Sequence, residues 1–253
     1  MGRPVEISGV VITKNEEKNI GRCLRSMDNV CDEIFVLDSG STDRTREIAE
    51  SFPKVKFLNV AWEGFAKTKN NGNDMAKGMY ILSMDADEEL SSELQSEILQ
   101  VKKSPFSNEA YFINRMTNYC GKWIYHSGWN PDFQLRLFPK AGSEWVGDHV
   151  HETLSVQPTV SKKYFENYAY HYSYYTIEEH VARINKYSTL GQDRYHHLPR
   201  KLIILRMVIN PPLRFFKSYV LKKGFLDGFE GFVIATLTAT AVFLKYAKAL
   251  SKK

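Results

Sequence analysis

Two aspartates separated by one residue, Asp85 and Asp87, follow an apolar run at residues 80–84. Alternate side chains of an extended chain point to the same side, so both carboxylates can face one partner. Mg²⁺ or Mn²⁺ relieves the repulsion of such a pair, and it completes its shell with water and phosphate oxygens. The pair therefore predicts a metal–diphosphate site, although an acidic turn that caps the following helix would have the same sequence.

Two further residues could support a nucleotide at the same place. Asp38 ends an apolar run at residues 33–37, where an acid can accept hydrogen bonds from ribose hydroxyls or a base N–H. Its segment, Asp38-Ser-Gly-Ser-Thr-Asp43, is also rich in turn-forming residues. Lys69 lies in a polar stretch near residues 65–77, where it can reach a phosphate or be ordinary surface charge.

Candidate acid–base groups lie in the second half of the chain. Asp148-His-Val-His-Glu152 places two histidines and two carboxylates within five residues, which could supply a metal ligand and a general base. His171 could complete a metal shell. Zinc is a rival for this group, although no HExxH motif is present, and an exposed polar hairpin would also fit.

The elements that must position these residues alternate between two hydrophobic periods. Apolar runs predict strands at residues 7–12, 33–37, 55–59 and 80–84. Helical spacing follows each of them. This alternation is typical of a parallel sheet with helices on both faces, which binds ligands beyond the carboxyl ends of its strands. Residues 111–172 predict short strands, and the chain beyond residue 176 predicts helices with a break at Asn210-Pro-Pro212.

Composition excludes several classes of protein. With 43% hydrophobic and 25% charged residues among 253, the chain is not collagen-like, coiled-coil or disordered. Its three cysteines form neither an even framework nor a CxxC pair, which favours a reducing compartment. No GxGxxG follows the first strand and no GxxxxGK[ST] occurs, so dinucleotide oxidoreductases and P-loop NTPases lack their signatures.

The net charge of +5 is unevenly distributed: the chain from residue 200 onward carries +9, and the preceding residues carry −4. Its basic residues alternate with apolar ones, which suits a helix in a membrane interface. The apolar run at residues 232–244 predicts a segment too short to span a bilayer comfortably. We therefore expect an anionic membrane surface rather than nucleic acid as the partner, with helices packed on the core as the alternative.

The N-terminus lacks the charged and apolar regions of a secretion signal. Together with the basic C-terminal region, this predicts a cytoplasmic protein that associates peripherally with the inner face of the cytoplasmic membrane.

Taken together, these motifs resemble the family 2 glycosyltransferases with the GT-A fold, especially the bacterial lipopolysaccharide core glucosyltransferases of the WaaE/KdtX-like group. The matching segments occur in the family's order over about nine-tenths of the chain. They are Val11-Ile-Thr-Lys-Asn-Glu-Glu17, Val36-Leu-Asp-Ser-Gly-Ser-Thr-Asp-Arg-Thr45, Trp62-Glu-Gly-Phe65, Lys69-Asn70, Asp85-Ala-Asp-Glu88, Gly128-Trp-Asn-Pro-Asp132, Arg136-Leu-Phe138, Val150-His-Glu152 and Gly224-Phe-Leu-Asp-Gly228. Thr68 departs from the glutamine that many relatives have.

The resemblance implies a Rossmann-like, mostly parallel α/β sheet over residues 1–175, with a nucleotide-sugar half at about 1–105 and an acceptor half at about 106–175. Residues 176–253 would form a helical, membrane-associating region. The implied reaction is an inverting transfer of a sugar from a nucleotide donor, UDP-linked, to a hydroxyl of a cell-envelope glycolipid such as lipopolysaccharide core, with Mg²⁺ or Mn²⁺ as cofactor.

The resemblance also assigns roles to individual residues. Glu152 would be the catalytic base, with Asp132 as second choice. Asp87 would face the metal, together with His171. The donor would be bound by Thr13, Asn15, Glu16, Asp38, Lys69, Asp85 and Arg136.

Two alternatives remain at this stage. A sugar-nucleotide nucleotidylyltransferase also uses paired carboxylates, but it usually has a glycine-rich basic loop where this chain has the acidic Thr13-Lys-Asn-Glu-Glu17. A membrane-bound module that binds polyanions without catalysis would depend on the basic tail alone.

Overall fold

The computed structural model describes residues 6–103, 108–147, 152–195 and 197–252. The chain divides into two compact units, each built from separate stretches. The first unit consists of Met1–Arg115 and Asp132–His171, and the second of Met116–Pro131 and Tyr172–Lys253. The expected nucleotide-sugar and acceptor halves are functional assignments and stay predictions.

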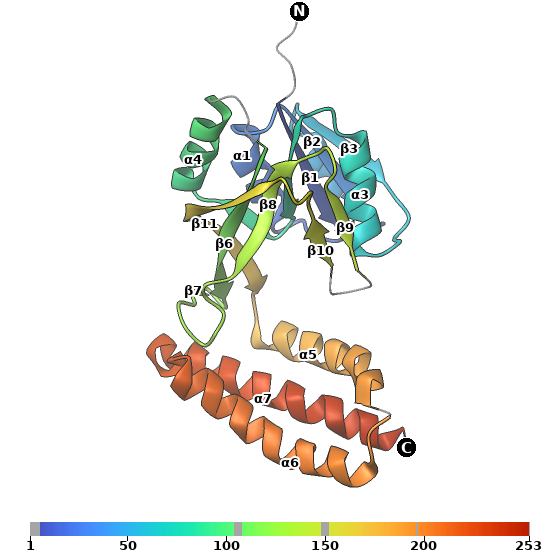
Figure 1. Cartoon of the computed structure of the whole chain (residues 1–253), viewed down its shortest axis with the longest axis vertical. Coiled ribbons are helices and arrows are strands. Elements are labelled where there is room, and N and C mark those ends of the chain that lie inside the picture. The colour runs from blue at the N-terminus through green and yellow to red at the C-terminus, as the bar shows by residue number, and fades with distance from the viewer. Residues whose placement is uncertain (1–5, 104–107, 148–151, 196, 253) are drawn as a thin grey trace, which may run out of the picture. The chain divides into compact units, whose positions relative to one another are not determined.

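The first half of the chain forms a parallel sheet in the order β3-β2-β1-β4 (Figure 1). Its strands are β1 (Ile7–Thr13), β2 (Glu33–Asp38), β3 (Val55–Asn59) and β4 (Tyr80–Asp85). Every residue of β1 and β2 is buried, as expected of parallel strands covered on both faces. All four strands lie where the apolar runs predict them.

Helices cover both faces of this sheet, as the sequence predicts. They are α1 (Ile20–Asp28), α2 (Thr45–Glu50), α3 (Phe65–Met75) and α4 (Ser92–Lys103). On one face Leu24 of α1 and Ile98 of α4 pack with Val11. On the other face Phe65 of α3 packs against a core that contains Val10.

The remainder of the sheet is antiparallel, so the expectation of a mostly parallel sheet holds only for its first half. The full order is β3-β2-β1-β4-β8-β6-β11-β5, with β7 paired to β6. The added strands are β5 (Glu88–Leu90), β6 (Glu109–Tyr119), β7 (Lys122–Trp123), β8 (Phe133–Pro139) and β11 (Ser161–Tyr174). The expected short strands are partly wrong, because β6 and β11 have 11 and 14 residues.

A separate two-stranded hairpin lies beside α3 (Figure 1). It pairs β9 (Glu144–Val146) with β10 (Thr153–Ser155). Trp145 of β9 is buried, and the Asn70 side chain of α3 bonds both its backbone N–H and its carbonyl at 2.9 Å. These bonds attach the hairpin to α3.

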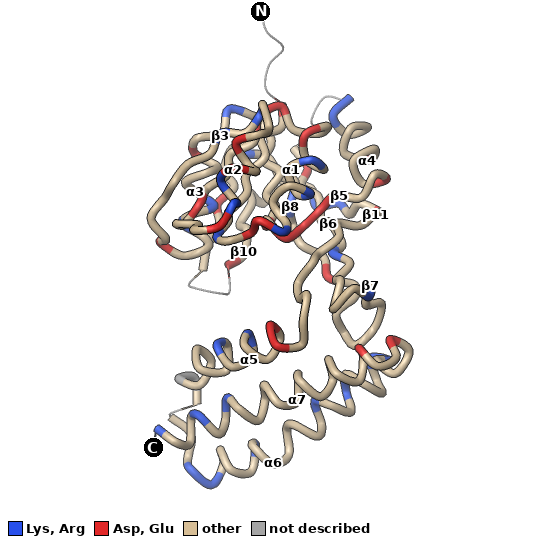
Figure 2. The backbone as a smooth tube through the Cα atoms, turned by 180° about the vertical axis from the view of Figure 1, so that it is seen from behind, with Lys and Arg blue, Asp and Glu red and all other residues tan. Residues whose placement is uncertain are grey.

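The second unit is mainly helical. It contains α5 (Ile177–Gly191), a 3₁₀ turn (Gln192–Tyr195), α6 (Arg200–Phe216), a π-helical turn (Lys217–Leu221), a second 3₁₀ turn (Gly224–Asp227) and α7 (Gly228–Ser251). Basic residues are spread along α6 and α7, as Figure 2 shows.

The break expected at Asn210-Pro-Pro212 is absent: α6 continues through both prolines. Each proline removes one backbone N–H from the helix. However, α6 packs along α7, and the Asn210 side-chain amide donates to the Tyr246 hydroxyl of α7 at 2.9 Å. Packing between these helices therefore outweighs the loss of local hydrogen bonds.

The prediction of an apolar segment too short to cross a bilayer is also wrong. Within the described residues, Gly224–Ser251 is long and apolar enough to cross a membrane, judged by length and composition. The apolar run at residues 232–244 continues at both ends within one helix, so its contiguous length underestimates the helical length.

Candidate active site

The carboxyl ends of β1, β2 and β4 meet at one edge of the sheet. Thr13 of β1 is opposite Asp38 of β2, and Ile12 of β1 is opposite Asp85 of β4. The predicted donor residues after these strands are therefore brought to the same edge. Thr13 is buried, and its hydroxyl has no hydrogen-bond partner among the described residues.

Asp38 begins a turn, which its sequence predicts as the alternative to a nucleotide-binding role for this residue. Its Oδ2 accepts hydrogen bonds from the backbone N–H groups of Gly40 at 3.0 Å and Ser41 at 2.8 Å. The Ser41 hydroxyl donates to Oδ1 of the same carboxylate. Gly40 has a φ of +84°, a conformation that favours glycine. Asp38 is only 2% exposed, and these hydrogen bonds join it to its own loop.

Asn15 and Glu16 connect the loop after β1 to the loop after β2. Asn15 has a φ of +55°, its backbone N–H donates to the Ser41 hydroxyl at 2.8 Å, and its side-chain oxygen accepts from the Thr42 N–H at 2.8 Å. The Glu16 backbone N–H donates to the Thr45 hydroxyl at 2.8 Å, and its carboxylate accepts from the Asn19 side chain at 2.7 Å. These two predicted donor residues thus fix the shape of the edge.

Asp85 lies among three cationic side chains. The Arg136 guanidinium is 2.6 Å from its Oδ2, and the Lys69 ammonium is 3.2 Å from its Oδ1. Arg115 is 3.8 Å away. Lys69 and Arg136 are almost fully buried, so the reading of Lys69 as ordinary surface charge is wrong.

Glu88 was not anticipated as a site residue, yet it is fully buried. Its carboxylate accepts from Arg115 at 3.0 Å, from Arg136, and from the backbone N–H of Asp85 at 3.0 Å. We call Lys69, Asp85, Glu88, Arg115 and Arg136 the charged cluster. β5 pairs with β11 at this point, so Glu88 belongs to the sheet rather than to a helix-capping turn.

The charges of this cluster set the ionisation of its members. Burial alone would raise the pKa of Asp85, but Arg136, Lys69 and Arg115 outweigh it and hold that pKa well below its usual value. Burial alone would lower the pKa of Arg136, but Asp85 and Glu88 outweigh it and raise that pKa. Asp85 is therefore a carboxylate, and it is not a candidate for carrying a proton.

The two predicted bases have different surroundings. Asp132 accepts two hydrogen bonds from Arg115 on Oδ2, at 2.9 and 2.6 Å, and one from Gln134 on Oδ1 at 2.7 Å. Glu152 Oε1 lies 3.4 Å from the Lys69 ammonium, which also lies 4.5 Å from the ring centroid of Trp145. Lys69 therefore connects Glu152 to Asp85.

The two predicted metal ligands form a pair. His171 Nε2 is 3.4 Å from Asp87 Oδ2, and both side chains are largely buried. His171 reaches this place because it lies opposite Glu88 in the pairing of β11 with β5. Of the remaining candidate acid–base group, residues 148–151 lie outside the described residues.

Arg115 and Glu88 are the residues that sequence reasoning missed. A usable signal was present for the arginine: with Asn114 it interrupts the otherwise apolar run Tyr111–Met116, and Arg136 likewise stands between Leu135 and Leu137. A cation within a buried strand requires a buried acid. That argument predicts a buried acidic partner for each arginine but does not identify it as Glu88.

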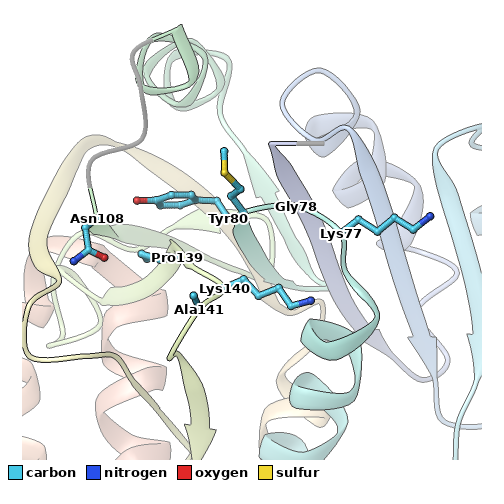
Figure 3. A pocket seen from close by; sticks show the side chains of 8 residues that line it. Lys77, Gly78, Tyr80, Asn108, Pro139, Lys140 and Ala141 are labelled. Atoms are coloured by element: carbon cyan, nitrogen blue, oxygen red, sulfur yellow. The ribbon is translucent and has the colours of Figure 1, made fainter. Parts of the chain in front are cut away.

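One cavity near the sheet lies away from these residues. It has a volume of about 740 Å³ and lies at the start of β4 and the end of β8, lined by Lys77, Gly78, Met79, Tyr80, Asn108, Pro139, Lys140 and Ala141 (Figure 3). None of the predicted site residues lines it. The carboxyl-edge residues, rather than this cavity, carry the candidate chemistry.

An α/β sheet with charged groups at the carboxyl ends of β1, β2 and β4, extended by antiparallel strands, is the architecture of GT-A glycosyltransferases. The chain belongs to glycosyl transferase family 2, whose family model matches residues 8–169. It is a glycosyltransferase. The nucleotidylyltransferase and the non-catalytic module are thereby set aside.

The chain is similar to the following proteins, of which the first two are named as glycosyltransferases. An uncharacterized glycosyltransferase of Rickettsia bellii is 33% identical over 252 residues, which cover 96% of this chain and 85% of that protein. LpsC of Rhizobium meliloti, a lipopolysaccharide core biosynthesis glycosyltransferase, is 24% identical over 95% of this chain and 93% of its own length. The crystal structure of S. aureus TarS 1–349 in complex with UDP-GlcNAc has a TM-score of 0.49 and 16% identity, over 98% of this chain and 90% of that one.

Proposed function

We propose that this glycosyltransferase moves a sugar from a UDP-linked donor to a hydroxyl of a lipid-linked cell-envelope glycan, with inversion at the anomeric carbon. Asp85 and Glu152 meet at Lys69 at the carboxyl edge of the sheet, and Asp87 pairs with His171 just beyond Asp85; this arrangement carries the proposal. The lipopolysaccharide role in the name of LpsC supports the class of acceptor.

The donor nucleoside lies against the loops after β1 and β2. Thr13 offers a buried hydroxyl without a partner among the described residues, and the neighbouring Ser39 offers another. Asn15 and Glu16 hold the two loops together. Asp38 serves the donor as a positioning residue, because its carboxylate holds the loop that follows it.

The residues present fit a divalent cation. Asp87 and His171 offer a carboxylate and an imidazole within 3.4 Å of each other, and both donor types are suitable for Mn²⁺. No set of three or more His, Cys, Asp or Glu side chains able to hold a metal occurs in the described part of the chain. Donor phosphate and water would therefore complete the shell.

When bound, the cation stabilises the negative charge that develops on the departing diphosphate. Lys69 and Arg136 add positive charge beside the same edge, and they hold Asp85 in place. Such preformed charges stabilise a transition state without needing to reorganise.

Glu152 accepts the proton of the acceptor hydroxyl. The oxygen forms a bond to the anomeric carbon as the bond to the diphosphate breaks, and the diphosphate leaves with that electron pair. Lys69 positions the Glu152 carboxylate from 3.4 Å. Both oxygens of Asp132 already accept hydrogen bonds, so Asp132 is the weaker candidate for the base.

A donor screen tests this proposal. UDP-, GDP- and dTDP-sugars are incubated with the full-length protein and Mn²⁺ or Mg²⁺, and sugar release or transfer is measured. We expect turnover with UDP-sugars that EDTA abolishes and Mn²⁺ restores. Asp87→Ala should lower turnover at least ~100-fold at saturating Mn²⁺, as loss of a charge-stabilising group does, with an unchanged melting temperature. Turnover only with GDP- or dTDP-sugars would contradict the donor assignment.

We also propose that the second unit binds the inner face of the cytoplasmic membrane. One face of α6 exposes apolar side chains at helical spacing: Ile204, Leu205, Val208, Ile209, Leu213 and Phe216. Arg200, Lys201, Arg206 and Arg214 lie on the same helix. Each basic residue near an anionic surface contributes about 1 kcal/mol.

Sedimentation with vesicles tests the membrane assignment. The protein should sediment with phosphatidylglycerol-containing vesicles and be released by salt, and it should stay in the supernatant with phosphatidylcholine alone. Replacing Leu205 and Val208 by Gln should reduce binding without changing UDP-sugar turnover in detergent-free buffer. Equal recovery from both kinds of vesicle would refute it.

A further inference from the structure

The antiparallel half of the sheet carries stacked aromatic rings on both of its faces. On one face Tyr111 of β6 stacks on Phe165 of β11, with ring centroids 4.7 Å apart, and both residues are buried in the core that contains side chains of α1 and α4. On the other face Phe112 of β6 stacks on Tyr164 of β11 at 4.8 Å. Phe133 of β8 is perpendicular to Tyr164, with ring centroids 5.0 Å apart. We call Phe112, Phe133 and Tyr164 the ring platform.

The ring platform is exposed where its counterpart on the other face is buried. Tyr164 is 59% exposed and Phe133 is 41% exposed, whereas Tyr111 and Phe165 are 7% and 6% exposed. Large aromatic side chains stabilise a fold mainly by being buried, so folding alone does not account for these exposed rings. Adjacent exposed apolar side chains are typical of a surface that binds a ligand or a partner.

The ring platform adjoins the candidate active site. Phe133 directly follows Asp132, whose carboxylate is hydrogen-bonded to the charged cluster. Phe112 packs against the same hydrophobic core as Leu154 of β10. Glu152, the proposed base, immediately precedes that strand. The platform and the proposed base are therefore on the same side of the sheet.

The order of the strands separates the ring platform from the donor residues. Thr13 and Asp38 end β1 and β2, which lie on one side of β4 in the sheet. The platform is carried by β8, β6 and β11, which follow β4 on its other side (Figure 1). Asp85, at the end of β4, lies between the two groups. A donor bound over β1 and β2 therefore leaves the platform to the second substrate, the acceptor.

The side chains that alternate along β11 define what the platform can bind. Asn167 of β11 faces α4, because its amide donates to the Glu97 carboxylate. Residues at the alternate positions of a strand point to the opposite face, and in β11 these are the exposed Lys162, Tyr164, Glu166 and Tyr168. An ammonium and a carboxylate thus lie on either side of the Tyr164 ring. The row has no net charge, and it can both donate and accept hydrogen bonds beside an apolar ring.

We propose that the ring platform and this row of β11 bind a neutral sugar unit of the acceptor glycan. One face of a sugar ring consists of C–H groups, which pack on an aromatic ring, and its edge consists of hydroxyls, which both donate and accept hydrogen bonds. Tyr164 contacts the C–H face, and Lys162 and Glu166 bind hydroxyls. Because Tyr164 and Tyr168 are four residues apart, about 13 Å along the strand, the row can accommodate more than one ring. The acceptor role rests on the proposed function, whereas the binding of sugar can be measured without it.

Saturation-transfer NMR on the full-length protein tests this binding. The probes are core oligosaccharide released from lipopolysaccharide by mild acid, maltotriose and chitotriose, each without nucleotide. Selective saturation of the aromatic protons of the protein should reach the ring C–H protons of at least one of these saccharides. Added UDP should not displace that saccharide, because the donor residues lie on the other side of β4.

Substitutions of Tyr164 assign the binding to the ring platform. Tyr164→Leu keeps an apolar side chain but removes the ring, so it should abolish the transfer and weaken saccharide binding about three- to tenfold, the contribution of an aromatic contact. Tyr164→Phe keeps the ring and should retain both. Trp62→Leu is the matched control, since Trp62 is another exposed aromatic residue of the first unit, and it should bind as wild type does.

Three results would overturn the proposal. They are the absence of transfer from aromatic protons to every saccharide, saccharide binding that is unchanged in Tyr164→Leu, and displacement of the saccharide by UDP. Failure of the donor screen with saccharide binding intact would contradict only the donor assignment. Turnover of UDP-sugars without saccharide binding would contradict only this inference, so the two proposals can fail separately.

Discussion

Each unit contains a cluster of buried polar side chains, and the two clusters are stabilised in opposite ways. In the first unit, the charged cluster places Asp85 and Glu88 among Lys69, Arg115 and Arg136. In the second unit, neutral rings surround a buried imidazole. We call Tyr119, Trp129, Tyr174 and His180 the aromatic cluster.

The aromatic cluster is held by one hydrogen bond and by ring contacts. The Tyr119 hydroxyl lies 3.0 Å from His180 Nδ1. The ring centroids of Tyr174 and His180 are 4.5 Å apart, and those of Tyr119 and Trp129 are 5.7 Å apart. Such ring contacts involve no ionised group, while the Arg183 guanidinium lies against the ring of Tyr174, 4.4 Å from its centroid. The difference indicates which cluster can take part in catalysis, because the charged cluster can stabilise the negative charge of a diphosphate. The charged cluster should also lose more stability when one of its ionised side chains is neutralised.

The largest expected effect comes from breaking the charged cluster at Glu88. Glu88→Gln should lower the free energy of unfolding by about 3–5 kcal/mol, because Arg115 and Arg136 each keep a buried charge after losing one of their two ionised partners. Urea denaturation followed by circular dichroism measures this. Glu144→Gln, at an exposed position of the same unit, should stay within about 0.5 kcal/mol of wild type. A decrease in the free energy of unfolding below about 1 kcal/mol for Glu88→Gln would mean that Arg115 and Arg136 do not depend on Glu88 for their stability in the folded protein.

The next effect separates chemistry from stability within the first unit. Glu152→Gln should lower turnover at least ~100-fold, the scale of general-base loss, while the unfolding free energy stays unchanged. Asp132→Asn should instead lower stability, because the hydrogen bonds from Arg115 would lose their ionised acceptor. Steady-state kinetics and urea denaturation on both variants decide the matter. Near-normal turnover in Glu152→Gln would eliminate Glu152 as the base.

Much of the parallel half was predictable because its signals are local. An apolar run predicts each of β1 to β4, and the helical spacing of Ile20, Cys23, Leu24 and Met27 predicts the face of α1 that is buried. The position of Asp85 and Asp38 at strand ends follows from the same runs. The turn around Asp38 could also be predicted from the sequence, because its hydrogen bonds join residues at most three positions apart.

The remainder depends on contacts between distant residues. β5 has three residues and becomes a strand only by pairing with β11, about 80 residues later. The burial of Glu88 follows from that pairing. The local sequence does not contain this information, and an acidic residue beside Asp87, just before a helix, predicted a helix cap instead. In α6 the two prolines predicted a break that is absent, because packing against α7 outweighs the local preference of proline.

The aromatic cluster should respond to pH in a window where Asp85 does not. Burial, and to a lesser extent the charge of Arg183, lowers the pKa of His180 to about 4. The unfolded chain, with a histidine pKa near 6.5, therefore binds more protons than the folded one between pH 6.5 and 4. Stability is complete above pH 6.5, and it falls with decreasing pH by at most about 1.4 kcal/mol per unit. Asp85, with a lowered pKa, contributes stability that is lost only below about pH 4.

Urea denaturation at pH 7 and pH 5.5 measures this difference. His180→Gln should reduce the loss between the two pH values by about 1 kcal/mol, because a glutamine oxygen can accept from Tyr119 but takes up no proton. His197→Gln is the control, since His197 is exposed in the same unit. An unchanged loss in His180→Gln would place the pH response elsewhere.

The smallest expected effect tests whether Asp38 works through its loop or on the donor itself. Asp38→Asn replaces charge-assisted hydrogen bonds to Gly40 and Ser41 by neutral ones and should lower the unfolding free energy by about 1 kcal/mol. If the carboxylate acts through the loop, Ser41→Ala should raise the KM for the UDP-sugar by a similar small factor, because it removes a hydrogen bond of the same turn. The kcat of both variants should stay at the wild-type value. A KM that rises much further in Asp38→Asn than in Ser41→Ala would mean that the carboxylate itself contacts the donor. Asp38 would then be a donor-binding residue and not only a residue that fixes the conformation of its loop.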